Sequence, residues 1–290
     1  MNEIGLEEIK GLTFDSFMGN MSYYVEKFLS DGVLFLKNFN PTRQQEWDIM
    51  VEFGNRINWF PNSTTGIVPT GPYECKELED HRYTFEAHTD TVNDKDHYFI
   101  HWHLDGVDRD KPQMGSLWHM RQFDCAPDSG QTGFVNMGYF YENLSEDYKN
   151  FLLSCGVKRH YRLDVTGFDY NLTDQQIKDS SPMALIVDHH FTDKKILRMD
   201  FYINESSLHS FNGRPATEEE KLKYTYIHAD IINQFCNDSS ISKWIEWEKG
   251  DVIITDLFVM AHAVKGGFKL GERKFSRIWA YKEEYIPFNR

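Results

Sequence analysis

Between Tyr98 and Val135 the chain alternates short apolar runs with turn signals, and this pattern constrains the fold more than any other feature. The turn signals are Asp105-Gly106, Asp110-Lys111-Pro112 and Pro127-Asp128-Ser129-Gly130. Runs of this length between such turns are typical of successive β-strands. Similar runs occupy residues 32–37, 244–255 and 274–282. Because strands do not alternate regularly with helices, we predict a mainly β fold with flanking helices, an antiparallel or mixed barrel or jelly roll, rather than a Rossmann sheet.

Three helices are expected around these strands. Thr42 with Gln45 and Thr217 with Glu220 match the capping box that opens a helix. The first of these helices is expected to end at Gly54, and a further helix is expected over residues 144–152. The helix that starts at Thr217 is expected to bury one apolar face, formed by Leu222, Tyr226, Ala229 and Ile232.

Composition and charge limit the partners. No Pro/Gly/Ser-rich linker or internal repeat divides the chain, so we expect one domain over residues 1–290. The formal charge is 31 − 45 = −14, which opposes binding to nucleic acid or to an anionic membrane. No window has the roughly 18 apolar residues of a membrane helix, and the start has no signal-peptide pattern. We therefore expect a cytoplasmic protein with a small-molecule substrate, compatible with a homo-oligomer.

Two His-x-Asp motifs suggest a metal centre. Residues two apart on an extended strand project to the same face, so His103 and Asp105, or His88 and Asp90, could occupy neighbouring coordination positions. One more histidine from a distant strand would complete the two-histidine, one-carboxylate triad of non-haem Fe(II) enzymes. Taken alone, a His-x-Asp motif also fits a histidine that is hydrogen-bonded near a turn.

The surroundings of the second motif carry a resemblance to a known family. Trp102-His103-Leu104-Asp105-Gly106 is followed by Pro112, the strand Gly115-Ser116-Leu117-Trp118-His119-Met120 and the turn Gly130-Gln131-Thr132. Further along stand Trp247, Gly250-Asp251, His262, Arg273 and Arg277. This order resembles the taurine dioxygenase (TauD/TfdA) family of Fe(II)/2-oxoglutarate oxygenases. The match favours His103 and Asp105 over His88 and Asp90.

The resemblance implies a fold, a set of cofactors and a reaction. The fold would be a double-stranded β-helix, a jelly-roll of the cupin-like type. Fe(II) would be held by His103, Asp105 and His262. Thr132 and Arg277 would bind the distal carboxylate of 2-oxoglutarate, and Arg273 would lie nearer the end that chelates iron. With O₂ as the other cosubstrate, the enzyme would hydroxylate, desaturate or cyclise an unactivated C–H bond, and retention of Asp105 argues against halogenation.

The strand expected over residues 274–282 bears on the arginines independently. Arg273, Phe275 and Arg277 alternate on one face of that strand, so the guanidinium groups are carried toward an aromatic interior. A buried guanidinium requires an anionic partner, and its planar fork suits a carboxylate. That partner is either a bound ligand or an acidic side chain of the protein.

The substrate is the least constrained part. Trp102, Trp118, His119 and Asn136 could line a pocket for a small polar molecule, and they equally fit strand packing. Gly106, directly after the carboxylate, resembles the branch of the family that acts on isonitrile-bearing amino acids, so an amino acid or an amino-acid-derived metabolite is one expectation. The alternative function is a non-redox, cupin-like protein that binds a metal or a small molecule, and a further alternative is an interaction domain with structural histidines.

Overall fold

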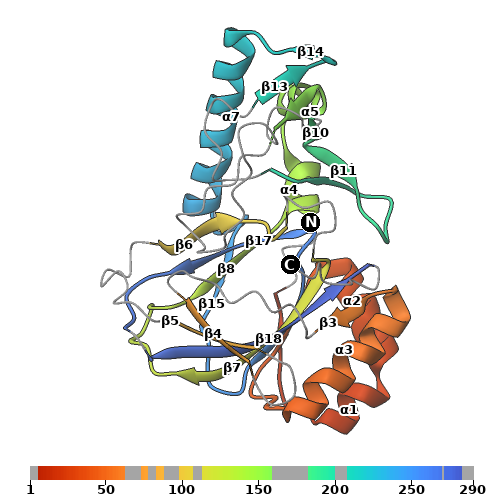
Figure 1. Ribbon diagram of the computed structural model, residues 1–290, viewed down its shortest axis with the longest axis vertical. Helices are drawn as coiled ribbons and strands as arrows, with labels where there is room; N and C mark the ends of the chain where they lie inside the picture. Colours follow the sequence, from red (N-terminus) through yellow and green to blue (C-terminus); the bar gives the residue numbers. More distant parts are fainter. Residues whose placement is uncertain are drawn as a thin grey trace.

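A computed structural model of the chain describes residues 6–62, 73–77, 83–87, 98–106, 113–158, 182–199, 208–269 and 271–282. Two β-sheets form the lower part of the molecule as drawn in Figure 1. The larger sheet has the order β1 (Glu8–Ile9), β2 (Val33–Leu36), β16 (Val252–Asp256), β7 (Gly115–Phe123), β18 (Arg273–Tyr281), β5 (Tyr83–Ala87) and β4 (Tyr73–Glu77), with β3 (Phe60–Asn62) also paired to β18. The smaller sheet has the order β15 (Lys243–Ile245), β8 (Thr132–Asn136), β17 (Met260–Lys265) and β6 (Tyr98–His103).

Antiparallel pairing dominates both sheets. Apart from the parallel pair β1–β2, every described pair in the two sheets is antiparallel. Side chains of β7 in the larger sheet meet side chains of β8 and β17 in the smaller one, as the rings of Trp118, Phe134 and His262 show. The expected mainly β architecture, with strands at 98–103, 115–123 and 132–136, is therefore present.

Helices cover the sheets from outside. The N-terminal helices are α1 (Phe14–Gly19), α2 (Met21–Asp31) and α3 (Arg43–Ile57), and the later ones are α4 (Met137–Asn143), α5 (Glu146–Leu153) and α7 (Glu218–Asn237). Helix α3 lies on the outer face of the larger sheet, where its Glu46 contacts His119 of β7 and Ser276 of β18. Because both faces of the central strands are covered, β2 and β16 carry nearly continuous apolar runs.

Small β elements complete the described chain above the two sheets in Figure 1. One sheet has the order β10 (Met183–Ala184), β9 (Cys155–Val157), β13 (Leu208–Phe211) and β14 (Arg214–Pro215). The other is a two-stranded sheet of β11 (Ile186–Asp188) and β12 (Lys195–Leu197).

Two of the expected helices start as predicted but differ in detail. Thr42 and Gln45 form the capping box of α3, but this helix continues past Gly54 to Ile57 and ends at Asn58, which has a left-handed φ of 54°. Gly54 instead allows the backbone at Trp59 to lie against the helix, because a Cβ at position 54 would lie 2.1 Å from the carbonyl oxygen of Trp59.

The predicted buried face of α7 is wrong. The capping box of Thr217 is present, yet Leu222 is 52% and Tyr226 67% exposed, and the buried face contains Tyr224 and Ile227. Apolar residues occur on two opposite sides of this helix, so periodicity alone did not determine which side packs on the protein.

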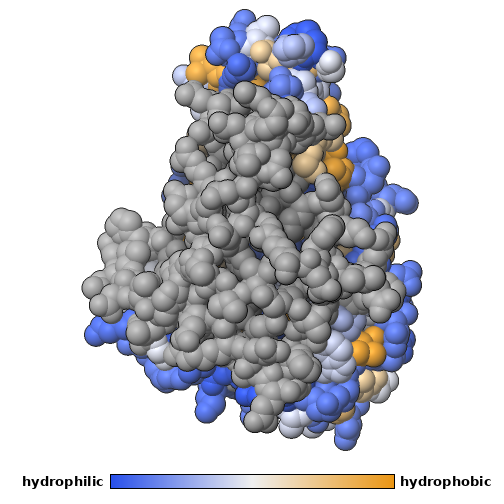
Figure 2. All heavy atoms as spheres, viewed as in Figure 1, coloured by the Kyte–Doolittle hydropathy of each residue, from blue (hydrophilic) through white to orange (hydrophobic). Residues whose placement is uncertain are grey.

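The described surface and helices bear on whether the chain could cross a membrane. Figure 2 shows mostly hydrophilic residues over the described part of this face, with small hydrophobic spots between them. Within the described chain, no helix is both long enough and apolar enough to cross a membrane.

Candidate active site

Three potential metal ligands converge between the two sheets. His103 ends β6, Asp105 stands in the turn that follows, and His262 lies on β17 directly opposite His103 in the strand pairing. One ligand atom from each residue lies within 4.8 Å of the others. The Nε2 atoms of His103 and His262 are 3.5 and 4.0 Å from Oδ1 of Asp105. Within the described residues this is the group of His, Cys, Asp and Glu side chains whose geometry suits a metal ion.

Both imidazole rings are oriented for ligation through Nε2. The Nδ1 atom of His103 lies 2.8 Å from the carbonyl oxygen of His101, and that of His262 lies 3.4 Å from the carbonyl oxygen of Met260. A carbonyl only accepts hydrogen bonds, so each Nδ1 carries the proton and each Nε2 keeps its lone pair toward the site. Histidine ligands in metal sites are commonly held by such a contact on the second ring nitrogen.

The electrostatics keep the ligands in the forms that bind cations. Burial, together with the nearby His103, lowers the pKa of His262 to about 3, so its ring is neutral near pH 7. Burial alone would raise the pKa of Asp105, but the neighbouring Arg277 guanidinium lowers it well below its ordinary value. Two imidazoles and one carboxylate fit a borderline divalent ion such as Fe(II).

Arg277 stands beside the metal ligands. Its Nη2 donates to Oδ2 of Asp105, and its Nε donates to the Ser116 hydroxyl at 3.0 Å. The guanidinium carbon lies 5.0 Å from the ring centroids of both Trp118 and Trp279. The inward direction expected for Arg277 is therefore correct, and within the protein its acidic partner is Asp105.

Arg273, rather than Arg277, pairs with Thr132. Nη2 of Arg273 donates to the Thr132 hydroxyl at 3.1 Å, and the indole Nε1 of Trp247 donates to the same oxygen at 2.8 Å. Thr132 and Arg273 are buried. Arg277 instead contacts Asp105, while Arg273, four residues earlier on the same face of β18, reaches Thr132 on β8.

Two expected substrate residues face away from the centre. On β7 the side chains alternate, so Trp118 points inward, with its ring 5.1 Å from that of His262, while its neighbour His119 points to α3. On β6 the same alternation turns Trp102 away from the metal side, onto Phe235 of α7 and Trp244 of β15. The structure therefore places His119 and Trp102 away from the metal ligands and Trp118 beside them.

His119 belongs to a buried polar cluster on the outer face of the larger sheet. Its Nδ1 lies 2.6 Å from Oε1 of Glu46, which also accepts from Arg121. Ser276 accepts from Arg121 Nε at 2.9 Å and donates to Glu46 at 3.4 Å. Burial lowers the pKa of His119, against the opposing contact with Glu46. No sequence pattern indicated this cluster, since Glu46 occupies an ordinary position in a helix.

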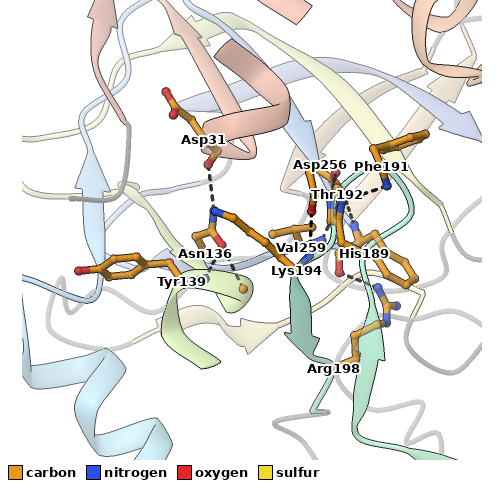
Figure 3. A network of polar contacts seen from close by, with 12 residues as sticks. Asp31, Asn136, Tyr139, His189, Phe191, Thr192, Lys194, Arg198, Asp256 and Val259 are labelled. Carbon is orange, nitrogen blue, oxygen red and sulfur yellow. Dashed lines mark hydrogen bonds and ion pairs between the residues drawn. The ribbon is translucent and has the colours of Figure 1, made fainter. Parts of the chain in front are cut away.

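Asn136 has a structural role that Figure 3 shows directly. Its side-chain oxygen accepts from the backbone N–H of Gly138 and Tyr139, which caps the start of α4, and its amide nitrogen donates to the carbonyl oxygen of Asp31 at 3.1 Å. All of its described hydrogen bonds are with backbone atoms, which gives Asn136 a role in capping α4.

A second pair in Figure 3 was missed by sequence reasoning. Nε2 of His189, at the tip of the β11–β12 hairpin, lies 3.4 Å from Oδ2 of Asp256, and Arg198 donates to the carbonyl oxygen of Phe258 at 2.7 Å. These contacts hold the turn between β16 and β17, three residues before His262. Nothing in their spacing along the chain signalled that they would meet.

The remaining expected residues are either outside the described chain or have a local structural explanation. The alternative motif His88 and Asp90, and the Pro112 of the family pattern, lie outside the described residues. Gly106 adopts a left-handed φ of 66°, which favours glycine directly after the metal carboxylate and gives it a local structural reason.

Comparison with known proteins agrees with this geometry. Two taurine dioxygenase structures from Burkholderia xenovorans, one described as a putative alpha-ketoglutarate-dependent enzyme, match with TM-scores of 0.64 and 0.63 at 15% and 17% identity, covering 97% and 95% of this chain and 89% and 86% of theirs. The structure of AAD-2 in complex with Mn(II) and N-oxalylglycine matches with a TM-score of 0.61 at 17% identity, over 99% of this chain and 98% of that one. A search of curated proteins gives no match.

The fold and the site define a jelly-roll protein with a two-histidine, one-carboxylate group that could hold a metal ion. The sequence model of the taurine catabolism dioxygenase TauD, TfdA family matches residues 21–279, and the chain belongs to this family. It is accordingly an oxygenase that uses Fe(II) and 2-oxoglutarate, and the expected jelly roll, cofactors and enzyme class are confirmed.

Proposed function

We propose that this enzyme holds Fe(II) through His103, Asp105 and His262 and oxidises an unactivated C–H bond of a small polar molecule. The observation that carries the metal assignment is the shared orientation of the two imidazoles, whose Nδ1 atoms contact backbone carbonyls while their Nε2 atoms face Asp105. When bound together, iron and 2-oxoglutarate supply the activation of O₂ that such an oxidation needs.

Thr132 and Arg273 bind the distal carboxylate of 2-oxoglutarate in this proposal. The Thr132 oxygen accepts from both Trp247 and Arg273. A hydroxyl has two acceptor positions and one hydrogen, so its own hydrogen remains available to donate to a carboxylate. Thr132 pairs with Val264, two residues along β17 from His262, which places it about 6.6 Å along the sheet from the metal ligands.

Arg277 lies at the chelating end of the cosubstrate in the same arrangement. Its guanidinium touches Asp105 and is enclosed by two indole rings, so it contributes fixed positive charge beside the metal without moving. The surrounding aromatic side chains limit the access of water to the metal ligands.

The substrate class and the outcome complete the proposal. Hydroxylation, desaturation and cyclisation all suit a site that keeps its carboxylate ligand Asp105, and the resemblance at Gly106 supports an amino acid or an amino-acid-derived metabolite. Trp118 is the one expected substrate residue that lies beside the metal ligands, so a small substrate at this centre would approach its ring.

Two measurements test the proposal. Anaerobic addition of 2-oxoglutarate to the Fe(II)-loaded protein is expected to give a weak visible charge-transfer band, which His103→Ala and Asp105→Ala abolish together with stoichiometric metal binding. The matched control is His119→Ala, a buried histidine that points to α3 and is expected to keep the band if the variant folds. A band unchanged in both ligand variants contradicts the metal assignment.

The substrate is found by succinate release. Amino acids, their derivatives and sulfonates are screened with O₂, and mass spectrometry records a gain of oxygen or a loss of two hydrogens in the product. Succinate release without product formation across all candidates contradicts the proposed substrate class. Absence of any succinate above the Asp105→Ala background favours the cupin-like binding protein.

A further inference from the structure

The indole N–H of Trp118 is buried without a hydrogen-bond partner among the described residues. The residue is 4% exposed, so water reaches it poorly. An N–H group withdrawn from water and left unbonded costs free energy, and such groups are rare in folded proteins. Its position beside the metal ligands makes this one significant.

Within the described part of the chain, no neighbour of Trp118 accepts a hydrogen bond from its indole N–H. The Arg277 guanidinium, 5.0 Å from the ring centroid, carries only donors. The rings of Phe134 and Phe275 lie at interplanar angles of 34° and 42°, tilted rather than edge-on. The edge-on neighbour is His262 at 66°, whose ring electrons are withdrawn by a cation on Nε2.

Two other buried indoles provide a contrast. The N–H groups of Trp59 and Trp102 also lack a hydrogen-bond partner among the described residues. Trp59 meets Phe28 at 89°, and Trp102 meets Phe235 at 67°. Edge-on packing of this kind offers the N–H an aromatic face, a weak but real acceptor. Both indoles lie within hydrophobic packing rather than at the metal centre.

We infer that the Trp118 indole N–H donates a hydrogen bond to an oxygen of bound 2-oxoglutarate at the end that chelates the metal. The inference rests on the proposed function. An ionised 2-oxo diacid carries only acceptor oxygens, and it meets only donors at Trp118 and Arg277. Trp118 pairs with Arg277 in the strand register and contacts His262, so it lies at the level of the metal and not at that of Thr132. Trp118 is thus a binding residue for the cosubstrate.

The test measures cosubstrate affinity without turnover. Mn(II)-loaded protein is titrated anaerobically with 2-oxoglutarate and, separately, with pyruvate, which has the chelating end but lacks the distal carboxylate. Trp118→Phe is expected to weaken both affinities by the same factor, about tenfold, because one hydrogen bond to a charged acceptor is lost. Thr132→Val is expected to weaken 2-oxoglutarate binding far more than pyruvate binding.

Two further variants isolate the N–H group. Trp102→Phe removes an equally buried indole N–H away from the metal and is expected to leave both affinities within twofold of wild type. Incorporation of benzothienylalanine at position 118 keeps the ring shape and replaces the N–H with sulfur, so it is expected to reproduce the Trp118→Phe loss even if the smaller phenylalanine disturbs packing.

The outcomes separate the inference from the proposed function. Wild-type protein that binds Mn(II) but neither 2-oxo acid overturns the proposed function itself. Wild-type binding with unchanged affinities in the benzothienylalanine protein overturns the inference alone. An effect confined to the Michaelis constant of the organic substrate also overturns it, because the donor would then serve that substrate.

Discussion

Replacing Thr132 with valine separates the two tasks of its hydroxyl. Valine has nearly the same shape, so the packing at this fully buried position changes little. The first loss is the donor that we assign to the distal carboxylate, and a hydrogen bond to a charged group contributes about 1.5–3 kcal/mol. At about 1.4 kcal/mol per tenfold, 2-oxoglutarate should bind roughly 10- to 100-fold more weakly. The second loss is the acceptor for the Trp247 indole, which is 2% exposed, so unfolding should become about 1–3 kcal/mol easier.

Thr132→Ser is the matched control, because it keeps the hydroxyl and loses only a methyl group, at about 0.8 kcal/mol. Affinity is measured by anaerobic titration of the Fe(II)-loaded variants with 2-oxoglutarate, following the charge-transfer band, and stability by urea unfolding. If the valine and serine variants bind 2-oxoglutarate within twofold of each other, the hydroxyl does not donate to the cosubstrate and the reasoning fails.

Three more predictions follow from the same contacts. Arg273→Met should raise the dissociation constant of 2-oxoglutarate by about 100-fold or more and leave that of pyruvate nearly unchanged. Arg277→Met should weaken the binding of both ligands. Equal behaviour of the two variants in parallel titrations would refute the division of roles between the arginines. Glu46→Ala should destabilise the fold by about 1–3 kcal/mol in urea unfolding, because it leaves the buried His119 ring without this hydrogen-bond partner and removes a carboxylate that Arg121 contacts, and an unchanged stability would show that the cluster contributes nothing. The pKa of His262 is lowered to about 3 in the folded protein, so the unfolded chain binds more protons below about pH 6.5 and the stability of the metal-free protein should fall as the pH drops from there toward 3. His262→Asn should flatten this fall, and an equally steep slope in that variant would count against the shifted pKa.

The metal ligands were predictable because their positions follow from local rules. His103 and Asp105 are two residues apart, at the end of β6 and in the turn that follows it, and the sequence around them carries the family pattern. His262 was expected from the same resemblance, and the strand pairing brings it opposite His103.

The assignment of the arginines required information that the sequence lacks. Alternation along β18 placed Arg273 and Arg277 on one face correctly, but which of them meets Thr132 depends on how β18 of the larger sheet lies over β8 of the smaller one. That offset is set by packing across the barrel, and the spacing of each arginine from His262 does not encode it.

The direction of a side chain could not be predicted from the sequence where both faces of its strand or helix are buried. β7 is buried on both sides at Trp118 and His119, so hydrophobicity could not show which of the two faces the metal. The same ambiguity misplaced Trp102 on β6 and the packed face of α7, since apolar residues on opposite sides satisfy either choice.

The Glu46 cluster has a consequence for how far the catalytic unit can be reduced. His119 and Ser276, which contact this carboxylate, are the immediate chain neighbours of Trp118 and Arg277. Shortening the enzyme to its two sheets would remove α3. With it would go the Glu46 carboxylate that contacts His119 and Arg121 on the outer face of the larger sheet, directly behind the metal site. The N-terminal helical layer therefore supports the strands that carry the site, and a smaller engineered version must supply an acid at that place or replace the basic side chains that contact it.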